Sequence, residues 1–290
     1  MLLLQMVVCS DKLNIIEDNF YVMRTKNFSE EDEEILLEYV SSIVNSKSKS
    51  MEKENKENGI KAFKNNIAVS KFKCKTKNQS EIVKSIGNKN TTITIVHGKP
   101  GTGKTYSAIQ GALKAFKNGS YDKIYLCKSV KTLDNKSEDI GFLKGTMEDK
   151  IAPFLFSFDF NFKQIINPGT YEMARQFQVI EFLPLAYIRG IGLNNCVIIL
   201  DEAQNINNAI LRTVLSRIGQ NCKLIILGDT QQKDSSSGQT SGLEFLIENF
   251  QDIEGFHVVK MTKEDQSRAD IINKIEDRYD ELESEGKKVA

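Results

Sequence analysis

The clearest chemistry in the sequence lies in residues 97–106, HGKPGTGKTY, between the β-branched run TTITIV and the helix-like run SAIQGALKAF. Glycines let the backbone turn so that its N–H groups converge, and the helix that follows adds the positive end of its dipole. These features are typical of a loop that binds phosphate groups. We predict that the loop contacts its ligand through Gly98, Lys99, Pro100, Gly101, Thr102, Gly103, Lys104, Thr105 and Tyr106.

The spacing of this segment matches the full phosphate-loop pattern, with Gly98 followed after four residues by Gly103, Lys104 and Thr105. In that pattern the lysine reaches the β- and γ-phosphates of a nucleoside triphosphate, and the hydroxyl ligates Mg²⁺. We therefore expect ATP and Mg²⁺ as cofactors, with Lys104 in catalysis and Thr105 as a metal ligand. A plain glycine turn between a strand and a helix is the alternative, and the rarity of the complete pattern disfavours it.

Two adjacent acids, Asp201 and Glu202, end the apolar run in CVIILDEAQN. Asp201 can hold Mg²⁺ directly or through water, and Glu202 is placed to orient and deprotonate an attacking water. Two acids at the end of a strand could instead cap the next helix. Beside a complete phosphate loop we prefer the catalytic interpretation.

Two glutamines each allow two interpretations. Gln232, in KLIILGDTQQKD, follows a further apolar run and could sense the γ-phosphate, although Gly-Asp pairs are also frequent in ordinary turns. Gln79 forms a possible capping box with Thr76 at the start of a helix. Its amide, which both donates and accepts, could equally read the edge of adenine.

Strand-like and helix-like runs that could position these groups alternate from about residue 74 onward. Several strand-like runs are apolar throughout, which is typical of parallel strands covered by helices on both faces. We therefore predict an α/β fold with a three-layer core, a mainly parallel sheet and phosphate chemistry at the carboxyl ends of the strands. The predicted strands are 92–96, 123–127, 179–183, 196–200, 223–227 and 256–260, and the predicted helices are 77–86, 104–117, 204–218, 240–249 and 265–284.

The first sixty residues differ in composition from the rest. Residues 29–44 have the acidic first turn and apolar stripe of an amphipathic helix. Residues 45–60 contain almost nothing apolar and are predicted to be a flexible linker. We therefore expect a small N-terminal appendage over residues 1–60 and one larger domain over residues 61–290.

Bulk composition excludes several classes of protein. The net charge is zero, so a purely electrostatic nucleic-acid binder is disfavoured. The five cysteines are widely spaced without a C-x-x-C pair, which predicts buried or idle thiols in a reducing compartment rather than disulfides or a zinc site. No apolar run is long enough to span a bilayer, and the N-terminus lacks the features of a secretory signal. We expect a cytoplasmic protein without a membrane partner.

Three further stretches make the pattern more specific. They are IGFLKGTMEDKIAPFL at 140–155, PLAYIRGIGLNNCVIILDEAQN at 184–205 and LSRIGQNCKLIILGDTQQKD at 215–234. Together with the nucleotide motifs they resemble the PhoH-like family of P-loop ATPases over residues 74–280. The resemblance implies a RecA-like core related to the first core domain of superfamily 1 helicases. The family is linked to bacterial phosphate starvation and RNA metabolism and is common in phages.

The resemblance also assigns residues. It places Lys104, Thr105, Asp201, Glu202 and Gln232 in the roles that the motifs suggest. It further draws attention to three arginines that could serve as the finger that stabilises charge on the transferred phosphoryl group, in this subunit or from the next. Each could instead be a surface or salt-bridging residue. These arginines are Arg189, Arg217 and Arg268.

The sequence departs from the family at positions that bear on nucleic-acid contact. Ile191 and Gly192 stand where Arg and Thr are frequent, and Lys128 stands where an Arg followed by Pro is usual. Some family members carry an N-terminal PIN nuclease. Residues 1–60 are too short for that domain and show no spaced acidic tetrad, so we predict no ribonuclease activity.

A superfamily 1 helicase closes ATP between two RecA-like domains, whereas this sequence predicts only one. We therefore expect a homo-oligomeric ring, six-membered by analogy with the family, in which a neighbour completes the site. RNA or single-stranded DNA is the expected polymer partner of this ATPase, with translocation or unwinding a further step. The alternatives are a small-molecule kinase and a nucleotide-gated assembly or regulatory protein with little turnover. Candidate phosphate contacts are Lys128, Lys131, Lys136 and Lys144.

Overall fold

The computed structural model describes residues 54, 57–68, 74–119, 121–129, 147–230 and 241–285. The chain divides into two compact units, Met1–Glu57 and Asn58–Ala290. The predicted helix at 29–44 lies outside the described residues, as does most of the predicted linker. Nearly all of the described residues belong to the second unit, which contains the sheet and the phosphate loop.

The end of the predicted linker is helical instead of flexible, since residues 57–66 form a helix. Its buried Phe63 packs against Phe116, with ring centroids 5.5 Å apart. Gly59 lies so close to the ring of Phe177 that a Cβ there would collide with it. Residues 57–66 therefore pack against the core through a few apolar and small residues, although residues 45–60 are mostly polar.

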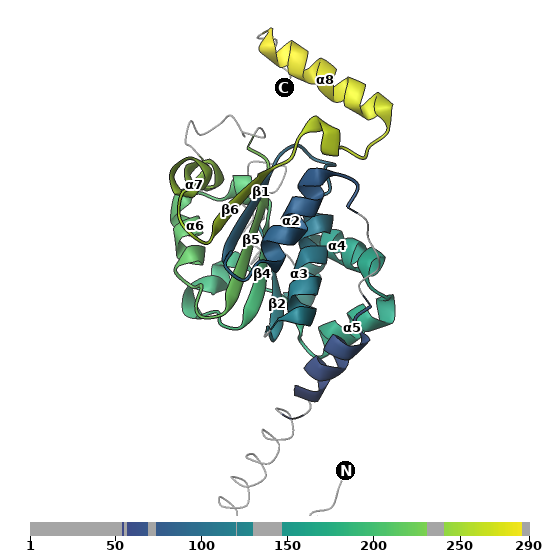
Figure 1. The fold of residues 1–290 in the computed structure, drawn as a ribbon, viewed down its shortest axis with the longest axis vertical. Coiled ribbons are helices and arrows are strands. Elements are labelled where there is room, and N and C mark those ends of the chain that lie inside the picture. Colours follow the sequence, from purple (N-terminus) through teal and green to yellow (C-terminus); the bar gives the residue numbers. More distant parts are fainter. Residues whose placement is uncertain are drawn as a thin grey trace, which may run out of the picture. The chain divides into compact units, whose positions relative to one another are not determined.

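The six predicted strands are confirmed, and every neighbouring pair is parallel (Figure 1). Their order in the sheet is β3-β2-β4-β5-β1-β6. β4 and β5 are buried along their whole length, which explains why their sequences are apolar at successive positions. The strands are β1 Ile93–His97, β2 Lys123–Lys128, β3 Ile180–Phe182, β4 Cys196–Asp201, β5 Cys222–Gly228 and β6 Phe256–Lys260.

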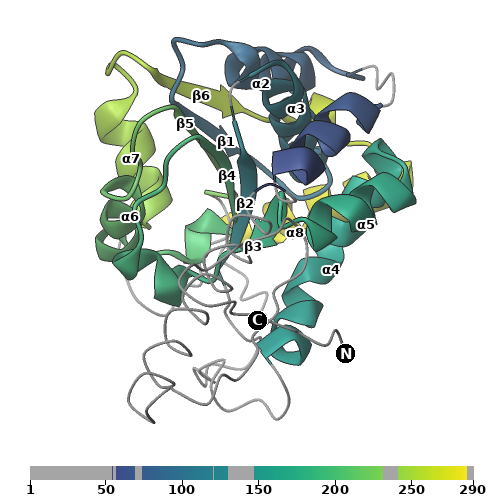
Figure 2. The same cartoon turned by 90° about the horizontal axis from the view of Figure 1, so that it is seen from below.

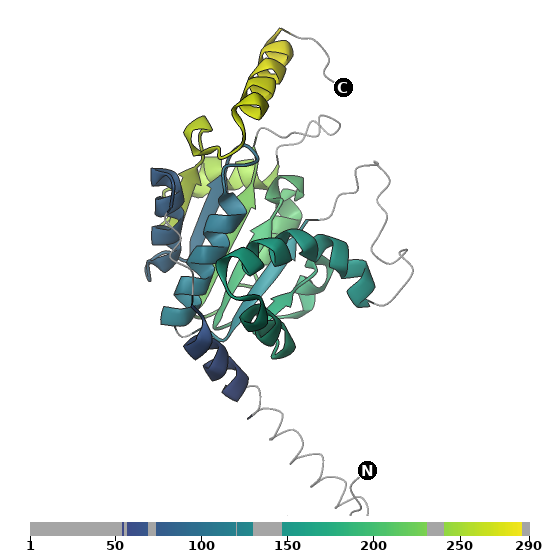
Figure 3. The same cartoon turned by 90° about the vertical axis from the view of Figure 1, so that its right-hand side faces the viewer.

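Helices cover both faces of the sheet and make the expected three layers (Figure 2). On one face lie α2 Lys77–Gly87, α3 Lys104–Asn118, α4 Met147–Ile165 and α5 Pro168–Gln176. On the other lie α6 Asn208–Leu215 and α7 Gly242–Phe250. The last helix, α8 Asp270–Ser284, extends beyond the sheet and covers neither face (Figure 3). Short 3₁₀ turns form η2 Leu185–Gly190, η3 Ala203–Asn205 and η4 Lys263–Asp265.

Two helix predictions are wrong in their bounds. The helix predicted at 204–218 is the 3₁₀ turn η3 followed by the shorter α6, which starts where the Asn207 side chain accepts a hydrogen bond from Ile210 N at 2.9 Å. The helix predicted from 265 starts at Asp270, and Asp265 instead belongs to the 3₁₀ turn η4, which begins with a capping box between Thr262 and Asp265.

α4 and α5 were not among the predicted helices. The sequence of α4 alternates phenylalanine with other residues, a period of two that is typical of strands. In the helix, Phe158 and Phe162 are four residues apart and buried, whereas Phe156 and Phe160 are four apart and exposed. The alternation therefore gives two separate helix faces, one facing the core and one facing solvent.

The strand order brings the chemical motifs to one place. β1 lies between β5 and β6, and β5 lies between β1 and β4. Because all strands are parallel, the phosphate loop after β1, the acids that end β4 and the turn after β5 meet at the same edge. Within the described ranges, no helix combines the length and apolarity needed to cross a membrane.

Candidate nucleotide-binding site

The phosphate loop has the conformation that its glycines allow. Gly101 and Gly103 have φ angles of 80° and 81°, in the left-handed region that other residues avoid. Gly103 is the residue from which α3 starts. The buried Thr102 closes the loop by donating from Oγ1 to Lys99 O at 2.9 Å. The loop is thus held in a phosphate-binding shape by its own hydrogen bonds.

Lys104 lies over this loop. Its Nζ donates to Lys99 O at 3.0 Å and also to Gly98 O. Burial lowers the pKa of Lys104, and the nearby carboxylates of Asp229, Asp201 and Glu202 oppose that change. Phosphate oxygens could replace these carbonyls, because the ammonium group already lies within reach of the loop that would cradle them.

The two predicted metal ligands are neighbours. Thr105 Oγ1 donates to Asp201 Oδ2 at 3.3 Å. Burial, and after it the negative charge of Glu202, raises the pKa of Asp201 to about 6. A hydroxyl and a carboxylate at the mouth of a phosphate loop suit Mg²⁺, which takes few protein ligands and keeps several waters. These two residues fit the cation that the sequence predicts.

Glu202 has an unusual backbone conformation, with φ 56° and ψ 40° in the left-handed region. A non-glycine residue held there costs about 1–3 kcal/mol, and such strain gathers at functional sites. Its backbone N–H donates to Asp201 Oδ1 at 3.0 Å, and its carboxylate accepts from Gln204 Nε2 at 2.7 Å. The turn therefore fixes the two carboxylates relative to each other.

Gln204 and Asp229 are site residues that the sequence did not predict. Gln204 Oε1 accepts from Asp229 N at 3.1 Å, so one amide joins the end of β4 to the end of β5. Both residues line a cavity at this edge of the sheet. Gln204 belongs to the motif DEAQN. Asp229 belongs to the motif GDTQQ, in which the prediction favoured Gln232. Gln232 lies outside the described residues.

Gln79 supports the phosphate loop through its side-chain amide. Thr76 Oγ1 accepts from Gln79 N at 3.2 Å, which confirms the helix cap. The reciprocal bond of the capping box is displaced by one residue, because Gln79 Oε1 accepts from Lys75 N at 2.9 Å. Gln79 Nε2 donates to Thr102 O at 3.1 Å. With both amide atoms bonded to backbone, Gln79 has a structural role here, and adenine recognition stays a prediction.

The structure separates the three arginine candidates. Arg268 lies against the phosphate loop, because a Cβ added to Gly101 would collide with its side chain. Arg217 follows α6, and its carbonyl accepts from Leu193 N at 2.9 Å just before β4 begins, at the opposite edge of the sheet. Arg189 lies exposed in η2 and does not line the cavity. Of the three, only Arg268 is near the loop of its own chain.

A cavity of about 420 Å³ occupies the edge where these groups meet. α4 contributes Asn161 to its wall, a residue that could not be found once the helix itself was missed. Asn161 Nδ2 donates to Ser157 O at 2.6 Å, and Lys128 Nζ donates to Ser157 Oγ at 3.1 Å. The cavity is lined by Pro100, Gly101, Gly103, Lys104, Thr105, Tyr106, Asn161, Asp201, Glu202, Gln204, Gly228 and Asp229.

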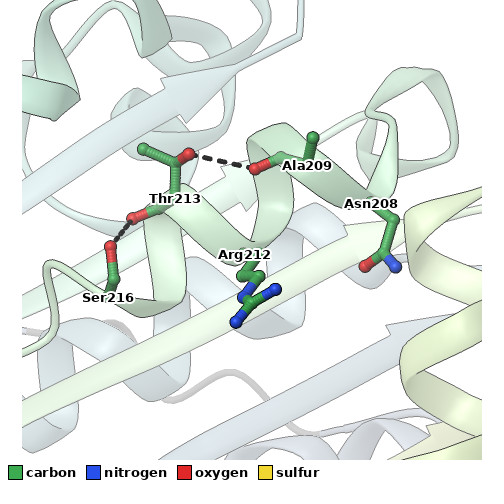
Figure 4. A pocket seen from close by; sticks show the side chains of 5 residues that line it. All are labelled: Asn208, Ala209, Arg212, Thr213 and Ser216. Atoms are coloured by element: carbon green, nitrogen blue, oxygen red, sulfur yellow. Dashed lines mark hydrogen bonds between the residues drawn. The ribbon is translucent and has the colours of Figure 1, made fainter.

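A larger hollow, of about 610 Å³, lies on the outer side of α6 (Figure 4). Thr213 Oγ1 donates to Ala209 O at 3.0 Å, and Ser216 Oγ donates to Thr213 O at 2.7 Å. Its walls come from one helix and the turn after it, and two of its hydroxyls are already bonded to backbone. Despite its size it lacks converging charged groups, so the smaller cavity is the candidate site.

A parallel sheet with a phosphate loop after β1 and an acid pair after β4 defines the class of P-loop NTPases. The chain belongs to the PhoH-like protein family, whose model matches residues 71–280.

Curated relatives agree with this assignment. The PhoH-like protein of Bacillus subtilis (strain 168) is 34% identical over 209 residues, covering 72% of this chain and 64% of that protein. Protein PhoH of Escherichia coli (strain K12) is 34% identical over 174 residues, covering 59% of this chain and 48% of that protein. The chain therefore spans less than two thirds of the length of these relatives.

Two solved structures are similar to part of this chain, with low TM-scores and low sequence identity. The large terminase of a thermophilic bacteriophage in complex with ADP has a TM-score of 0.39 and 12% identity, covering 70% of this chain and 49% of that one. The Sulfolobus solfataricus SWI2/SNF2 ATPase core in complex with dsDNA has a TM-score of 0.34 and 15% identity, covering 56% of this chain and 33% of that one.

Proposed function

We propose that this protein is a Mg²⁺-dependent ATPase whose turnover is coupled to RNA or single-stranded DNA. The observation that carries the proposal is the convergence of Lys104, the Thr105–Asp201 pair and the Glu202–Gln204 pair on one cavity. A site that only binds nucleotide has no need of a second carboxylate held beside the metal ligand.

The residues divide the work of hydrolysis. The loop amides and Lys104 bind the phosphates, and Thr105 and Asp201 would hold Mg²⁺, which withdraws charge from the phosphate oxygens. Glu202 accepts the proton of the attacking water. Gln204 orients that carboxylate through its 2.7 Å hydrogen bond. Arg268, beside the loop, supplies positive charge near the transferred group.

Phosphate release measured with and without single-stranded RNA or DNA tests the proposal. Lys104→Ala is expected to abolish nucleotide binding, and Glu202→Gln to bind ATP and retain it unhydrolysed. Normal hydrolysis by Glu202→Gln would refute the assignment of the base. A small-molecule kinase would instead transfer phosphate to an added acceptor, and a nucleotide-gated scaffold would bind ATP with negligible turnover.

Coupling to a polymer is supported by the surface beside the cavity. Lys128 ends β2 and bonds to Ser157, one turn from Asn161 in the cavity wall. Phe156 and Phe160 are 72% and 58% exposed on the same helix, as base-stacking residues need to be. The other predicted lysine contacts, 131, 136 and 144, lie outside the described residues. Translocation or unwinding is a further step of the same proposal.

We also propose that the active form is a homo-oligomeric ring, six-membered by analogy with the family. α8 supports a contact between copies, since it carries exposed apolar residues along one stripe and covers neither face of the sheet. The native mass with and without a non-hydrolysable ATP analogue tests this, and a monomer under both conditions would refute it. The exposed stripe comprises Ile271, Ile272, Ile275 and Tyr279.

A further inference from the structure

Two cysteines face each other on the neighbouring strands β4 and β5. Cys196 is the first residue of β4 and Cys222 the first residue of β5, and they are register partners. Their Sγ atoms lie 3.5 Å apart. Opposite residues on neighbouring strands project to the same face of a sheet. Twenty-five residues separate them in sequence, so neither spacing nor motif indicates the pair.

The surroundings make these thiols unequal. Cys196 is fully buried, while Cys222 is 7% exposed. The hydrogen bond from the Cys196 thiol lowers the pKa of Cys222, and the same bond followed by burial raises the pKa of Cys196. One sulfur of the pair is therefore the better thiolate and the other the proton holder, and while Cys222 is protonated its thiol donates to Leu193 O at 3.0 Å. Since the thiolate is the nucleophile, Cys222 is the sulfur that reacts first.

We propose that Cys196 and Cys222 form a reversible disulfide between β4 and β5 when the protein meets a hydroperoxide. The Cys222 thiolate attacks the peroxide oxygen, the O–O bond breaks, and a sulfenic acid forms while the leaving oxygen departs as hydroxide or alkoxide. Cys196 sulfur then attacks the sulfenic sulfur, forming the S–S bond and releasing water. For hydrogen peroxide, two thiols lose two electrons and two protons and two water molecules form.

The strand geometry allows the two sulfurs to be joined. Neighbouring strands are about 4.8 Å apart, which is close to the lower end of the Cα separations that disulfides span, about 4.4–6.8 Å. A bond between the two sulfurs can therefore form without moving the strands apart. A dithiol would reverse the bond by attack at Cys222, the more exposed of the two sulfurs.

The cross-link would restrain the segment that carries the catalytic acids. Residues 197–221 lie between the two cysteines and include Asp201, Glu202 and α6. Closing this segment into a covalent loop limits its local opening. Hydrogen exchange over residues 197–221 is expected to slow in the oxidised protein, while exchange in α2 on the opposite face is unchanged.

The full chain provides a direct test. Protein treated with hydrogen peroxide is denatured, its remaining thiols are alkylated, and trypsin is added. Cleavage after Arg212 and Arg217 puts the two cysteines on separate peptides. We expect one cross-linked species that lacks two hydrogens and disappears after dithiothreitol. Alkylation of both thiols after peroxide treatment, a sulfinic acid on Cys222 with free Cys196, or pairing with Cys9 or Cys74 would overturn the proposal.

Cys127 offers a matched control. It is fully buried in the neighbouring strand β2, no sulfur partner is found for it among the described residues, and burial raises its pKa to about 12. Cys127→Ala is expected to keep the cross-link, whereas Cys196→Ala and Cys222→Ala each lose it. Circular dichroism establishes that each variant is folded. If an alanine variant does not fold, the peptide map of the unmodified chain still decides the outcome.

Discussion

The carboxylate of Glu202 accepts a 2.7 Å hydrogen bond from the side-chain amide of Gln204. The other end of the same amide accepts from Asp229 N, so the bond fixes the proposed base relative to the end of β5 as well. Gly228 makes this possible, since a Cβ there would lie 2.9 Å from Gln204 Oε1. Two segments that are far apart in sequence, the end of β4 and the end of β5, thus set the direction of one carboxylate.

Gln204→Ala tests this arrangement. Without the amide, the Glu202 carboxylate can rotate away from the attacking water, so turnover should fall by about 10- to 100-fold, less than when the base itself is removed. ATP affinity should change less, since the amide of Gln204 bonds to Glu202 and to Asp229 N. Steady-state hydrolysis and calorimetric binding of a non-hydrolysable analogue separate the two effects. A loss confined to affinity would show that Gln204 contacts nucleotide instead of positioning Glu202.

The sequence was sufficient for the sheet and for part of the site. β-branched and apolar runs located all six strands, most clearly β4 and β5, which are buried along their whole length. The phosphate loop and the acid pair were found because their spacing is set by the chemistry of phosphate and metal. Placing them at one edge of the sheet followed from parallel topology alone.

The remaining site residues depend on tertiary contacts that no local pattern encodes. Asn161 reaches the cavity from α4, whose alternating phenylalanines have the period of a strand. Gln79 was correctly placed at a helix cap, but its bond to Thr102 joins segments 23 residues apart. Arg217 lies in the turn before β5, at the end of the sheet opposite the loop. Sequence spacing does not reveal that placement.

Gly101→Ala tests the loop conformation. The φ angle of 80° disfavours any side chain, and a Cβ would collide with Arg268. Strain of about 1–3 kcal/mol is expected to shift the loop, and ATP affinity should fall by about tenfold. Gly192→Ala is the control, because no atom lies within 4 Å of a Cβ at that position. Equal ATP affinity in the two variants would mean that the loop tolerates a side chain there.

Asp265 is expected to make a pH-dependent contribution to the free energy of unfolding. Burial alone would raise the pKa of Asp265, but hydrogen bonds from the Thr262 backbone and from the Thr76, Asn78 and Thr262 side chains lower it. Asn78 Nδ2 and Thr262 N donate to Asp265 Oδ2 at 2.8 and 2.7 Å. Because the folded-state pKa lies below the unfolded value of about 3.9, the stabilisation is present above that value and is lost as the pH falls through the folded-state pKa.

Asp265→Asn should therefore lower the free energy of unfolding by about 1–2 kcal/mol at pH 7, since hydrogen bonds to a charged acceptor are worth more than those to a neutral one. The difference from the unmodified protein should shrink as the pH approaches 3. Urea unfolding at several pH values measures it. Asp252→Asn, an exposed turn position, should change nothing. A difference that stays constant down to pH 3 would show that packing, not charge, is involved.

Arg268 is expected to act on the nucleotide of its own chain, because it lies against Gly101 and is tied to α8 by a 3.4 Å ion pair with Glu276. Arg268→Ala should lower turnover by about 10³-fold, the lower end of the range for an arginine that stabilises transition-state charge. Mixing Arg268→Ala subunits with Lys104→Ala subunits should restore nothing, since every site then lacks either the lysine or its own arginine. Arg217 lies at the far end of the sheet, so any catalytic role for it requires a second copy. If Arg217 has that role, mixing Arg217→Ala subunits with Lys104→Ala subunits would regain activity. Recovery in the Arg268 mixture would instead place that arginine in the neighbouring site.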